Sequence, residues 1–138
     1  MSSKNILKLM KDKEIEFVDF RFTDPRGKLQ HLTMDATIVD DEMLEEGVFF
    51  DGSSIAGWKA INESDMILKP DLARPIVDPF NSHNTLNIFC DILDAVKKEP
   101  YERDPRGTAK KAENYLKKSG VETKHTLVLN QNFLRLMM

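Results

Sequence analysis

Residues 49–71, FFDGSSIAGWKAINESDMILKPD, hold the densest set of structure-determining residues in this chain. The eight positions from Asp51 to Trp58 contain an acidic residue, two serines, two glycines and the only tryptophan. Because Gly52 and Gly57 permit backbone conformations that other residues resist, this segment is predicted to be a shaped loop. Loops on rigid scaffolds often carry function. The alternative is a tight turn whose Asp and Ser side chains only hydrogen-bond the local backbone.

Length and composition indicate one domain, with an appendage at most. The chain has 138 residues, of which 41% are hydrophobic and 31% charged, enough for a packed core and a soluble surface. A net charge of -3 and the lack of a basic block argue against nucleic-acid binding. No apolar run approaches the length of a membrane span, and residues 1–4 lead into charge, unlike a signal peptide.

The cysteine and histidine content limits which disulfides and metal sites the chain could form. The single Cys90 excludes an internal disulfide framework and fits a reducing compartment, so we expect a cytoplasmic protein with a buried structural thiol. The histidines, His31, His83 and His125, share no ligand-like spacing and predict no metal site. Phosphate-binding and dinucleotide-binding glycine motifs are also missing from the sequence.

Residues before the loop predict a helix, a hairpin and a second short helix. The first helix is capped by Ser2 or Ser3. A strand over 15–23 is expected to carry a bulge at Phe17-Val18, where the alternation of apolar residues slips. The remaining expected elements, in order, are a turn at Asp24-Pro25-Arg26-Gly27, a return strand over 29–34, and a helix that starts at Asp40 or Asp41 and ends at Gly47.

Residues after the loop predict three strands and a final helix. The strands are expected at 66–68, 76–77 and 86–93, the last being the most apolar run and therefore central. Asp104 should cap a helix that Pro105 begins and Gly120 ends. The second copy of Asp-Pro-Arg-Gly, at 104–107, is thus no repeat of the first. Together these elements predict an α+β fold, a small sheet with a helix on one face.

The loop motif closely resembles the N-terminal signature of the glutamine synthetase family. The resemblance rests on Phe50, Asp51, Gly52, Ser53, Ser54, Gly57, Trp58, Ser64 and Asp65, and on flanking blocks at 18–24 and 103–106 that agree with the bacterial type. It covers roughly residues 4 to 121; Ala56, where many relatives carry glycine, is a small-for-small departure. The resemblance implies an N-terminal helix (1–13), a β-grasp-like domain with a mixed sheet (14–100) and the first helix of a catalytic domain (101–120).

The resemblance also implies a reaction, the ATP-dependent ligation of ammonia to L-glutamate with Mg or Mn ions. By motif match, Asp51 is the catalytic carboxylate that attracts ammonium and accepts its proton, with Ser54 beside it. In the family this loop reaches into the active site of a neighbouring subunit, within a homo-dodecamer of two hexameric rings. The family's metal ligands and its nucleotide and glutamate pockets lie beyond residue 121. We therefore expect no bound cofactor or metal and no ligase activity from this chain alone.

Two other functions stay open. A γ-glutamyl ligase of the same family would use an amine other than ammonia. A non-catalytic β-grasp module would bind protein partners and neither ATP nor metal.

Residues 121–138, VETKHTLVLNQNFLRLMM, break the resemblance. The family continues with a strand of the form YFGPExEFF that supplies metal ligands, whereas no carboxylate side chain follows Glu122 here. The codons from Glu122 onward can be read in a shifted frame, in which the third base of each codon joins the first two bases of the next. This shifted frame can encode D-x-A-Y-F-G-P-E-P-E-F-F-x-F-D-D. We therefore expect an aberrant, frameshifted tail produced by the loss of one base near Val121. The alternative is a genuine divergent C-terminus.

Overall fold

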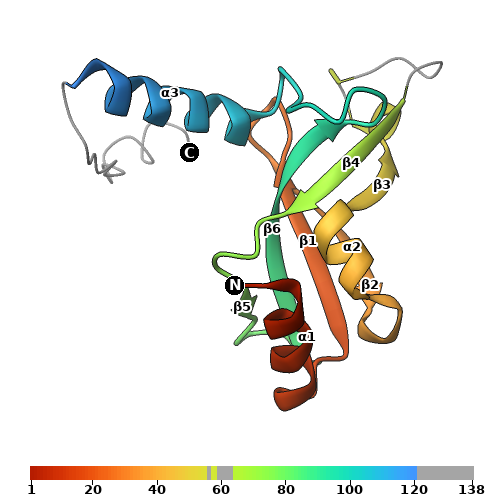
Figure 1. Cartoon of the computed structure of the whole chain (residues 1–138). Coiled ribbons are helices and arrows are strands. Elements are labelled where there is room, and N and C mark those ends of the chain that lie inside the picture. The colour runs from red at the N-terminus through yellow and green to blue at the C-terminus, as the bar shows by residue number, and fades with distance from the viewer. Residues whose placement is uncertain (56, 59–63, 121–138) are drawn as a thin grey trace, which may run out of the picture.

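The structure is a computed structural model that describes residues 1–55, 57–58 and 64–120 (Figure 1). The expected tail at 121–138 and the departure at Ala56 lie outside the described residues. Six strands of the described part form one mixed sheet in the order β2-β1-β6-β4-β3, with β5 paired to β6. Their bounds are β1 (Phe17–Thr23), β2 (Leu29–Asp35), β3 (Val48–Asp51), β4 (Asp65–Pro70), β5 (Ile76–Val77) and β6 (Thr85–Asp94). Helices α1 and α2 lie against the sheet, as the α+β prediction requires, while α3 extends away from it (Figure 1).

The two N-terminal helices begin and end at the expected residues. Helix α1 (Ser3–Asp12) is capped by Ser2, whose hydroxyl accepts a hydrogen bond from the Asn5 amide. Helix α2 (Asp41–Glu46) is capped by Asp40 and ends at Gly47. At φ +100° Gly47 adopts a backbone conformation that side chains resist, and an added Cβ would lie 2.6 Å from the Leu68 carbonyl oxygen.

Strands β1 (Phe17–Thr23) and β2 (Leu29–Asp35) form the predicted hairpin, but the predicted bulge is wrong. The antiparallel register runs without interruption from Phe17↔Asp35 to Thr23↔Leu29. The apparent slip arises because Ile15 precedes the strand, and its amide donates to the Met10 carbonyl in the connection from α1. Within the strand, Val18, Phe20 and Phe22 alternate regularly into the core.

Strand β6 (Thr85–Asp94) is the central strand, as its apolar run predicted. It pairs parallel to β1 and antiparallel to both β4 (Asp65–Pro70) and β5 (Ile76–Val77). Leu86, Ile88 and Ile92 are fully buried, as is Cys90, where burial raises the thiol pKa far above its ordinary value. Cys90 is therefore the structural thiol that the sequence predicted, because a protonated buried thiol is a poor nucleophile.

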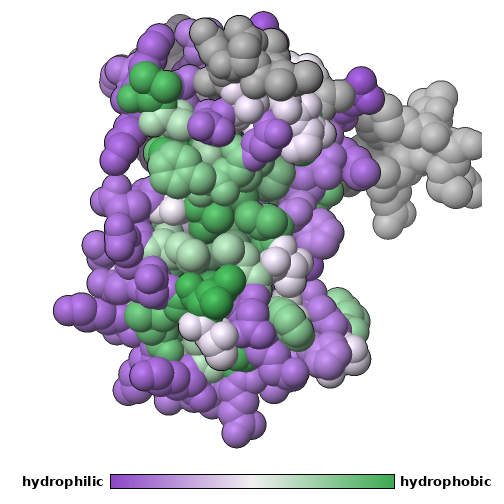
Figure 2. Space-filling view, turned by 90° about the vertical axis from the view of Figure 1, so that its right-hand side faces the viewer, coloured by the Kyte–Doolittle hydropathy of each residue, from purple (hydrophilic) through white to green (hydrophobic). Residues whose placement is uncertain are grey.

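The core is only partly covered on the side of β2 and α2. Figure 2 shows apolar side chains gathered in a column on this side, bordered by polar ones. Leu32 and Met34 of β2 and Met43 of α2 pack against the core yet are only half-buried.

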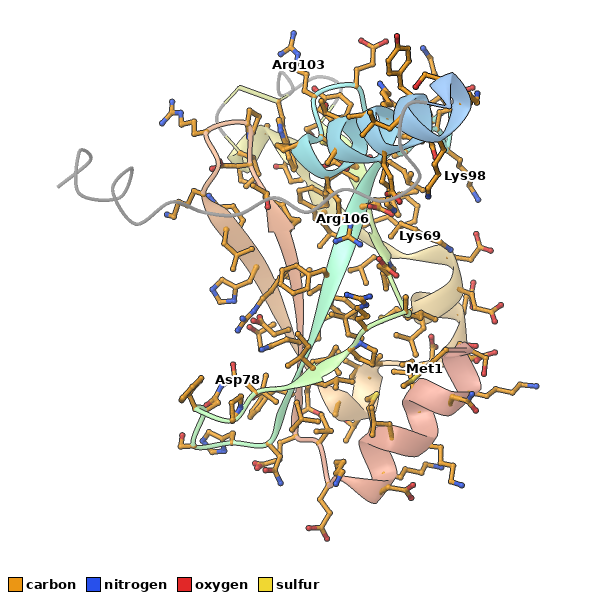
Figure 3. All side chains as sticks on the ribbon, turned by 90° about the vertical axis from the view of Figure 1, so that its left-hand side faces the viewer. Met1, Lys69, Asp78, Lys98, Arg103 and Arg106 are labelled. Atoms are coloured by element: carbon orange, nitrogen blue, oxygen red, sulfur yellow. The ribbon has the colours of Figure 1, made fainter. Side chains whose placement is uncertain are left out.

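Helix α3 (Pro105–Ser119) follows the predicted limits, with Asp104 as its cap and Gly120 in the left-handed region at its end. None of its side chains is buried against the described residues, and Tyr115 is 72% exposed. Arg106, labelled in Figure 3, ties the base of the helix to the sheet by ion pairs with Asp71 and Asp91. In the described part of the chain, no helix has the length and apolar character needed to cross a membrane.

Candidate functional site

The Asp51 loop begins where strand β3 (Val48–Asp51) ends, and it opens with a short 3₁₀ turn over Gly52–Ser54. The Asp51 carboxylate caps this turn by accepting a hydrogen bond from the Ser53 amide at 2.8 Å. The Ser54 hydroxyl donates to the backbone carbonyl of Asp51. Asp51 and Ser54 are both exposed, so the turn presents the carboxylate to solvent while Ser54 braces the backbone beneath it.

Gly52 is required by close packing and not by its backbone angle. Its amide donates to the Ser64 carbonyl at 2.8 Å, which ties the start of the turn to the residue before strand β4. A Cβ at this position would lie 2.8 Å from the Met66 Cγ and 3.0 Å from the Ser64 carbonyl oxygen. Gly57, by contrast, has φ +90° with open space around it, which is the conformational role that the sequence predicted for both glycines.

The Asp51 carboxylate is held in its charged form. Hydrogen bonds from the Ser53 hydroxyl and amide, and from the Ser64 hydroxyl, lower the pKa of Asp51 below its ordinary value. A lowered pKa makes the group a stable anion near neutral pH. It therefore suits the attraction of a small cation better than the acceptance of a proton.

An aromatic cluster fixes the far end of the loop. Trp58 is only 4% exposed, and its ring lies 5.6 Å from that of Phe22 and 5.9 Å from those of Phe50 and Tyr101. Phe50 immediately precedes Asp51, so the cluster holds both sides of the loop. Aromatic pairs at such distances contribute about 0.5–1.5 kcal/mol beyond the apolar area that they bury.

Two residues of the connection to α3 contact the same end of the loop, and sequence reasoning gave them no role. The Tyr101 hydroxyl donates to the Trp58 carbonyl at 2.9 Å, and Arg103 Nη1 donates to the Gly57 carbonyl at 2.9 Å. Arg103, labelled in Figure 3, belongs to the block at 103–106 that carried the family resemblance, which was the available signal. An open cavity of ≈ 370 Å³ lies here, lined by Trp58, Asp94, Lys97, Glu99, Pro100, Tyr101, Glu102 and Arg103.

The described residues offer no ready ligand set for a cation cofactor. Among them, no three His, Cys, Asp or Glu side chains come together as a metal site. In the described part of the loop, the turn fixed by serines, a glycine and an aromatic cluster presents the exposed Asp51 carboxylate, and the exposed Asp65 lies opposite it in the β3–β4 pairing.

Comparison with known proteins identifies this arrangement. The family model for the glutamine synthetase β-grasp domain matches residues 14–95. The chain belongs to the glutamine synthetase family. The fold class inferred from the resemblance is thereby confirmed as well, because the matched domain is a β-grasp domain.

Individual relatives agree with the family assignment. Glutamine synthetase from Rhizobium meliloti (strain 1021) is 61% identical over 120 residues, which are 87% of this chain and 26% of that protein. The enzyme from Escherichia coli (strain K12) is 51% identical over 121 residues, which are 88% of this chain and 26% of that protein. The solved Plasmodium falciparum glutamine synthetase superposes with a TM-score of 0.77 at 27% identity, covering 87% of this chain and 23% of that one.

The chain spans about a quarter of the length of the curated relatives that it matches. The structure brings Asp51 and Ser54 together on one turn, as the motif predicts. Their catalytic roles stay predictions.

Proposed function

We propose that this chain is the N-terminal part of an enzyme that ligates ammonia to L-glutamate with ATP, and that the Asp51 loop supplies its ammonium-binding anion. Family membership supports the reaction, and the exposed, hydrogen-bonded Asp51 carboxylate is the observation that supports its role. The nucleotide, the glutamate and the divalent ion, Mg or Mn, are expected to bind to parts of the enzyme beyond this chain. When bound, the divalent ion would neutralise the charge of the phosphate groups.

Ammonium must lose a proton before its nitrogen can attack the activated carboxyl group of glutamate. A site for it needs an anion that attracts the cation and, at a later stage, a group that accepts the proton. The lowered pKa of Asp51 favours the first role in the exposed loop. Burial raises the pKa of a carboxylate, so contact with a neighbouring subunit would make Asp51 a better proton acceptor.

Such a shared site fits the exposed position of the loop. Asp51 points from the end of a strand into solvent, where the surface of a second subunit could complete the site. The proposed assembly is the family's homo-dodecamer of two hexameric rings, in the cytoplasm. Ser54 would act by bracing the backbone under Asp51, since its hydroxyl donates to the Asp51 carbonyl. The chain alone is expected to be inactive.

The test is a chimaera in which residues 1–120 of this chain replace the corresponding part of the Rhizobium meliloti enzyme. The chimaera should make glutamine from glutamate, ammonium and ATP. Asp51→Asn keeps the size of the side chain and its acceptor oxygen but removes the charge. It should lower turnover with ammonium by roughly two to four powers of ten, the usual scale for the loss of a general base.

Asp35→Asn is the matched control. Asp35 is also exposed, caps a 3₁₀ turn (Ala36–Ile38) and accepts from the amide two residues on, at 2.8 Å. Its pKa is likewise lowered, by Thr37. If Asp51 only braces its turn, the two substitutions should have the same small effect on turnover. A large loss at Asp51 alone, with equal thermal melts, supports the ammonium site.

The same chimaera separates the alternatives. Faster turnover with an alkylamine than with ammonium would favour a γ-glutamyl ligase acting on another amine. A correctly assembled chimaera without any activity, beside a stable monomeric chain that binds neither ATP nor metal, would favour a non-catalytic module.

We also propose that residues 121–138 are a shifted-frame reading of the family's next strand. The matches to the Rhizobium meliloti and Escherichia coli enzymes span 120 and 121 of the 138 residues, which is consistent with this account. The test is the DNA sequence around codon 121. If the downstream DNA, read one frame over, does not encode a glutamine synthetase catalytic domain, the frameshift proposal is wrong.

A further inference from the structure

Two side chains from the connection before α3 hold the backbone of the Asp51 loop from 43 to 46 positions away in the sequence. Arg103 Nη1 lies 2.9 Å from the Gly57 carbonyl oxygen and 3.4 Å from that of Trp58. The Tyr101 hydroxyl donates to the same Trp58 carbonyl. The consecutive carbonyls of Gly57 and Trp58 therefore both accept hydrogen bonds from one short segment, residues 101–103.

From this point hydrogen bonds lead back to Asp51. The Trp58 amide donates to the Ile55 carbonyl at 3.2 Å, and the Ile55 amide donates to the Gly52 carbonyl at 3.1 Å. The Asp51 carboxylate caps the turn that contains Gly52. A displacement of the Gly57-Trp58 backbone is therefore transmitted to the turn that orients the carboxylate.

The donors themselves are fixed to the central strand. The Tyr101 amide donates to the Ile92 carbonyl at 2.9 Å, and the Asp104 amide donates to the Tyr101 carbonyl at 3.1 Å. Asp104, only 2% exposed, also accepts from the Ile92 amide. Arg103 lies between two residues that are tied to β6, so its guanidinium reaches the loop from a rigid base.

We propose that Tyr101 and Arg103 are positioning residues that hold the Asp51 carboxylate in place for ammonium. This inference rests on the proposed function of the loop. The planar guanidinium of arginine presents several N–H donors in a fixed fork, which suits two neighbouring carbonyls better than a lysine ammonium does. Both residues act on Asp51 through the loop backbone.

The first experiment measures amide hydrogen exchange in the 138-residue chain. Arg103→Met and Tyr101→Phe each remove donors to the loop, and the phenylalanine keeps the ring that packs against Trp58. Arg74→Met, at an exposed arginine between β4 and β5, is the matched control. We expect the Ile55 and Trp58 amides to exchange roughly tenfold faster in Arg103→Met, as the loss of a charged hydrogen bond implies.

Exchange at Phe20 and Ile88, in the sheet, should not change. If Ile55 and Trp58 exchange in Arg103→Met as slowly as in Arg74→Met, the inference is wrong. Should Arg103→Met loosen the sheet as well, Tyr101→Phe decides, because it removes one hydroxyl only. Faster exchange confined to the loop in that variant supports the inference, and unchanged exchange overturns it.

The second experiment uses the Rhizobium meliloti chimaera. Arg103→Met should raise the KM for ammonium several-fold and leave the KM for ATP unchanged, whereas general destabilisation would alter both or neither. Arg103→Lys should recover part of the ammonium affinity. An equal change in both KM values overturns the positioning role. An unmodified chimaera without activity would count against the proposed function, while the exchange experiment tests the loop contacts independently.

Discussion

The tetrapeptide Asp-Pro-Arg-Gly occurs twice in this chain and folds differently each time. At 24–27 it forms the turn of the β1–β2 hairpin, and at 104–107 it begins helix α3. The first half of the motif behaves alike in both places. The aspartate carboxylate accepts a hydrogen bond from the arginine amide two residues on, at 2.9 Å for Asp24 and 3.0 Å for Asp104.

The two copies diverge at the glycine. Gly27 has φ +82° and its amide donates to the Asp24 carbonyl, so the chain reverses. After Gly107 the Thr108 amide donates to the Asp104 carbonyl, and the helix continues. The segments that follow differ: residues 29–35 pair with β1 and alternate in burial along the strand, whereas TAKKA is rich in helix formers.

The copies also differ in what they hold together. Asp24 accepts from Lys28 and Gln30 of its own hairpin. Asp104 accepts from the Gly107 amide of its helix and from the Ile92 amide of strand β6. The first motif is therefore a local turn, and the second is a joint between the sheet and α3. Substitutions at matching positions test this difference directly.

The largest difference is expected at the aspartates. Asp104→Ala leaves three backbone amides without their acceptor, one of them in a buried strand, and should lower the free energy of unfolding by about 3 kcal/mol. Asp24→Ala should cost less, because the amides that Asp24 accepts from belong to the exposed residues Arg26 and Lys28, where water can replace the lost acceptor. Urea unfolding of both variants, with Asp104→Asn as the control that keeps an acceptor oxygen, would measure the gap. Equal losses of stability at the two positions would contradict the conclusion that Asp104 joins the sheet to α3.

A smaller difference is expected at the arginines. Arg106 pairs with Asp91 at 2.8 Å and with Asp71, so Arg106→Met should lower the free energy of unfolding by about 1 kcal/mol. Arg26 is exposed, and Arg26→Met should change stability by less than about 0.5 kcal/mol. Added salt should weaken the stabilising effect of Arg106 only partly, because partly buried ion pairs are screened less than exposed charges. Indistinguishable urea midpoints for the two variants would show that Arg106 does not tie α3 to the sheet.

Substitution of the glycines should have opposite signs. Gly27→Ala places a side chain at φ +82° and should destabilise the hairpin by about 1 kcal/mol. Gly107→Ala adds a Cβ at 3.4 Å from Asp104 Oδ2, an ordinary contact, within a helix. It should stabilise the protein by about 0.5 kcal/mol. Thermal melts of the pair would check the signs, and a loss of stability at both positions would contradict the comparison.

Elements with local signals were predictable from the sequence. The predicted caps, at Ser2 or Ser3, at Asp40 or Asp41 and at Asp104, and the predicted stops at Gly47 and Gly120 agree with the helix limits in the structure, where Ser2 and Asp40 are the caps used. The central strand followed from its apolar run. The bulge prediction failed because periodicity alone could not show that Ile15 belongs to the connection before β1.

Features that depend on distant residues were not predictable in this way. Gly52 packs against Met66, and Tyr101 and Arg103 hold the loop from more than forty positions away. Such contacts depend on the order of the strands in the sheet, and this order cannot be read from a single sequence. The family resemblance named Asp51 and Ser54, but it did not show which groups hold them.

The smallest expected effect is a change in the stability of the hairpin at acid pH. The Gln30 side chain and the Lys28 and Arg26 amides lower the pKa of Asp24, against a smaller opposing effect of burial. A carboxylate whose pKa is lower in the folded than in the unfolded state stabilises the fold above its unfolded pKa, and this contribution is lost as the pH falls through the folded pKa. Asp24→Asn should therefore be less stable than the parent chain at neutral pH, and the two should converge below about pH 4.

Urea midpoints of both proteins across this range would measure the convergence. The substitution keeps an acceptor oxygen for the Arg26 and Lys28 amides, so the part of the gap that depends on pH reports the charge and not the geometry of the turn. A gap that stays constant from neutral to acid pH would mean that Asp24 stabilises the hairpin only as a hydrogen-bond acceptor. The local turn would then need the shape of an aspartate but not its charge.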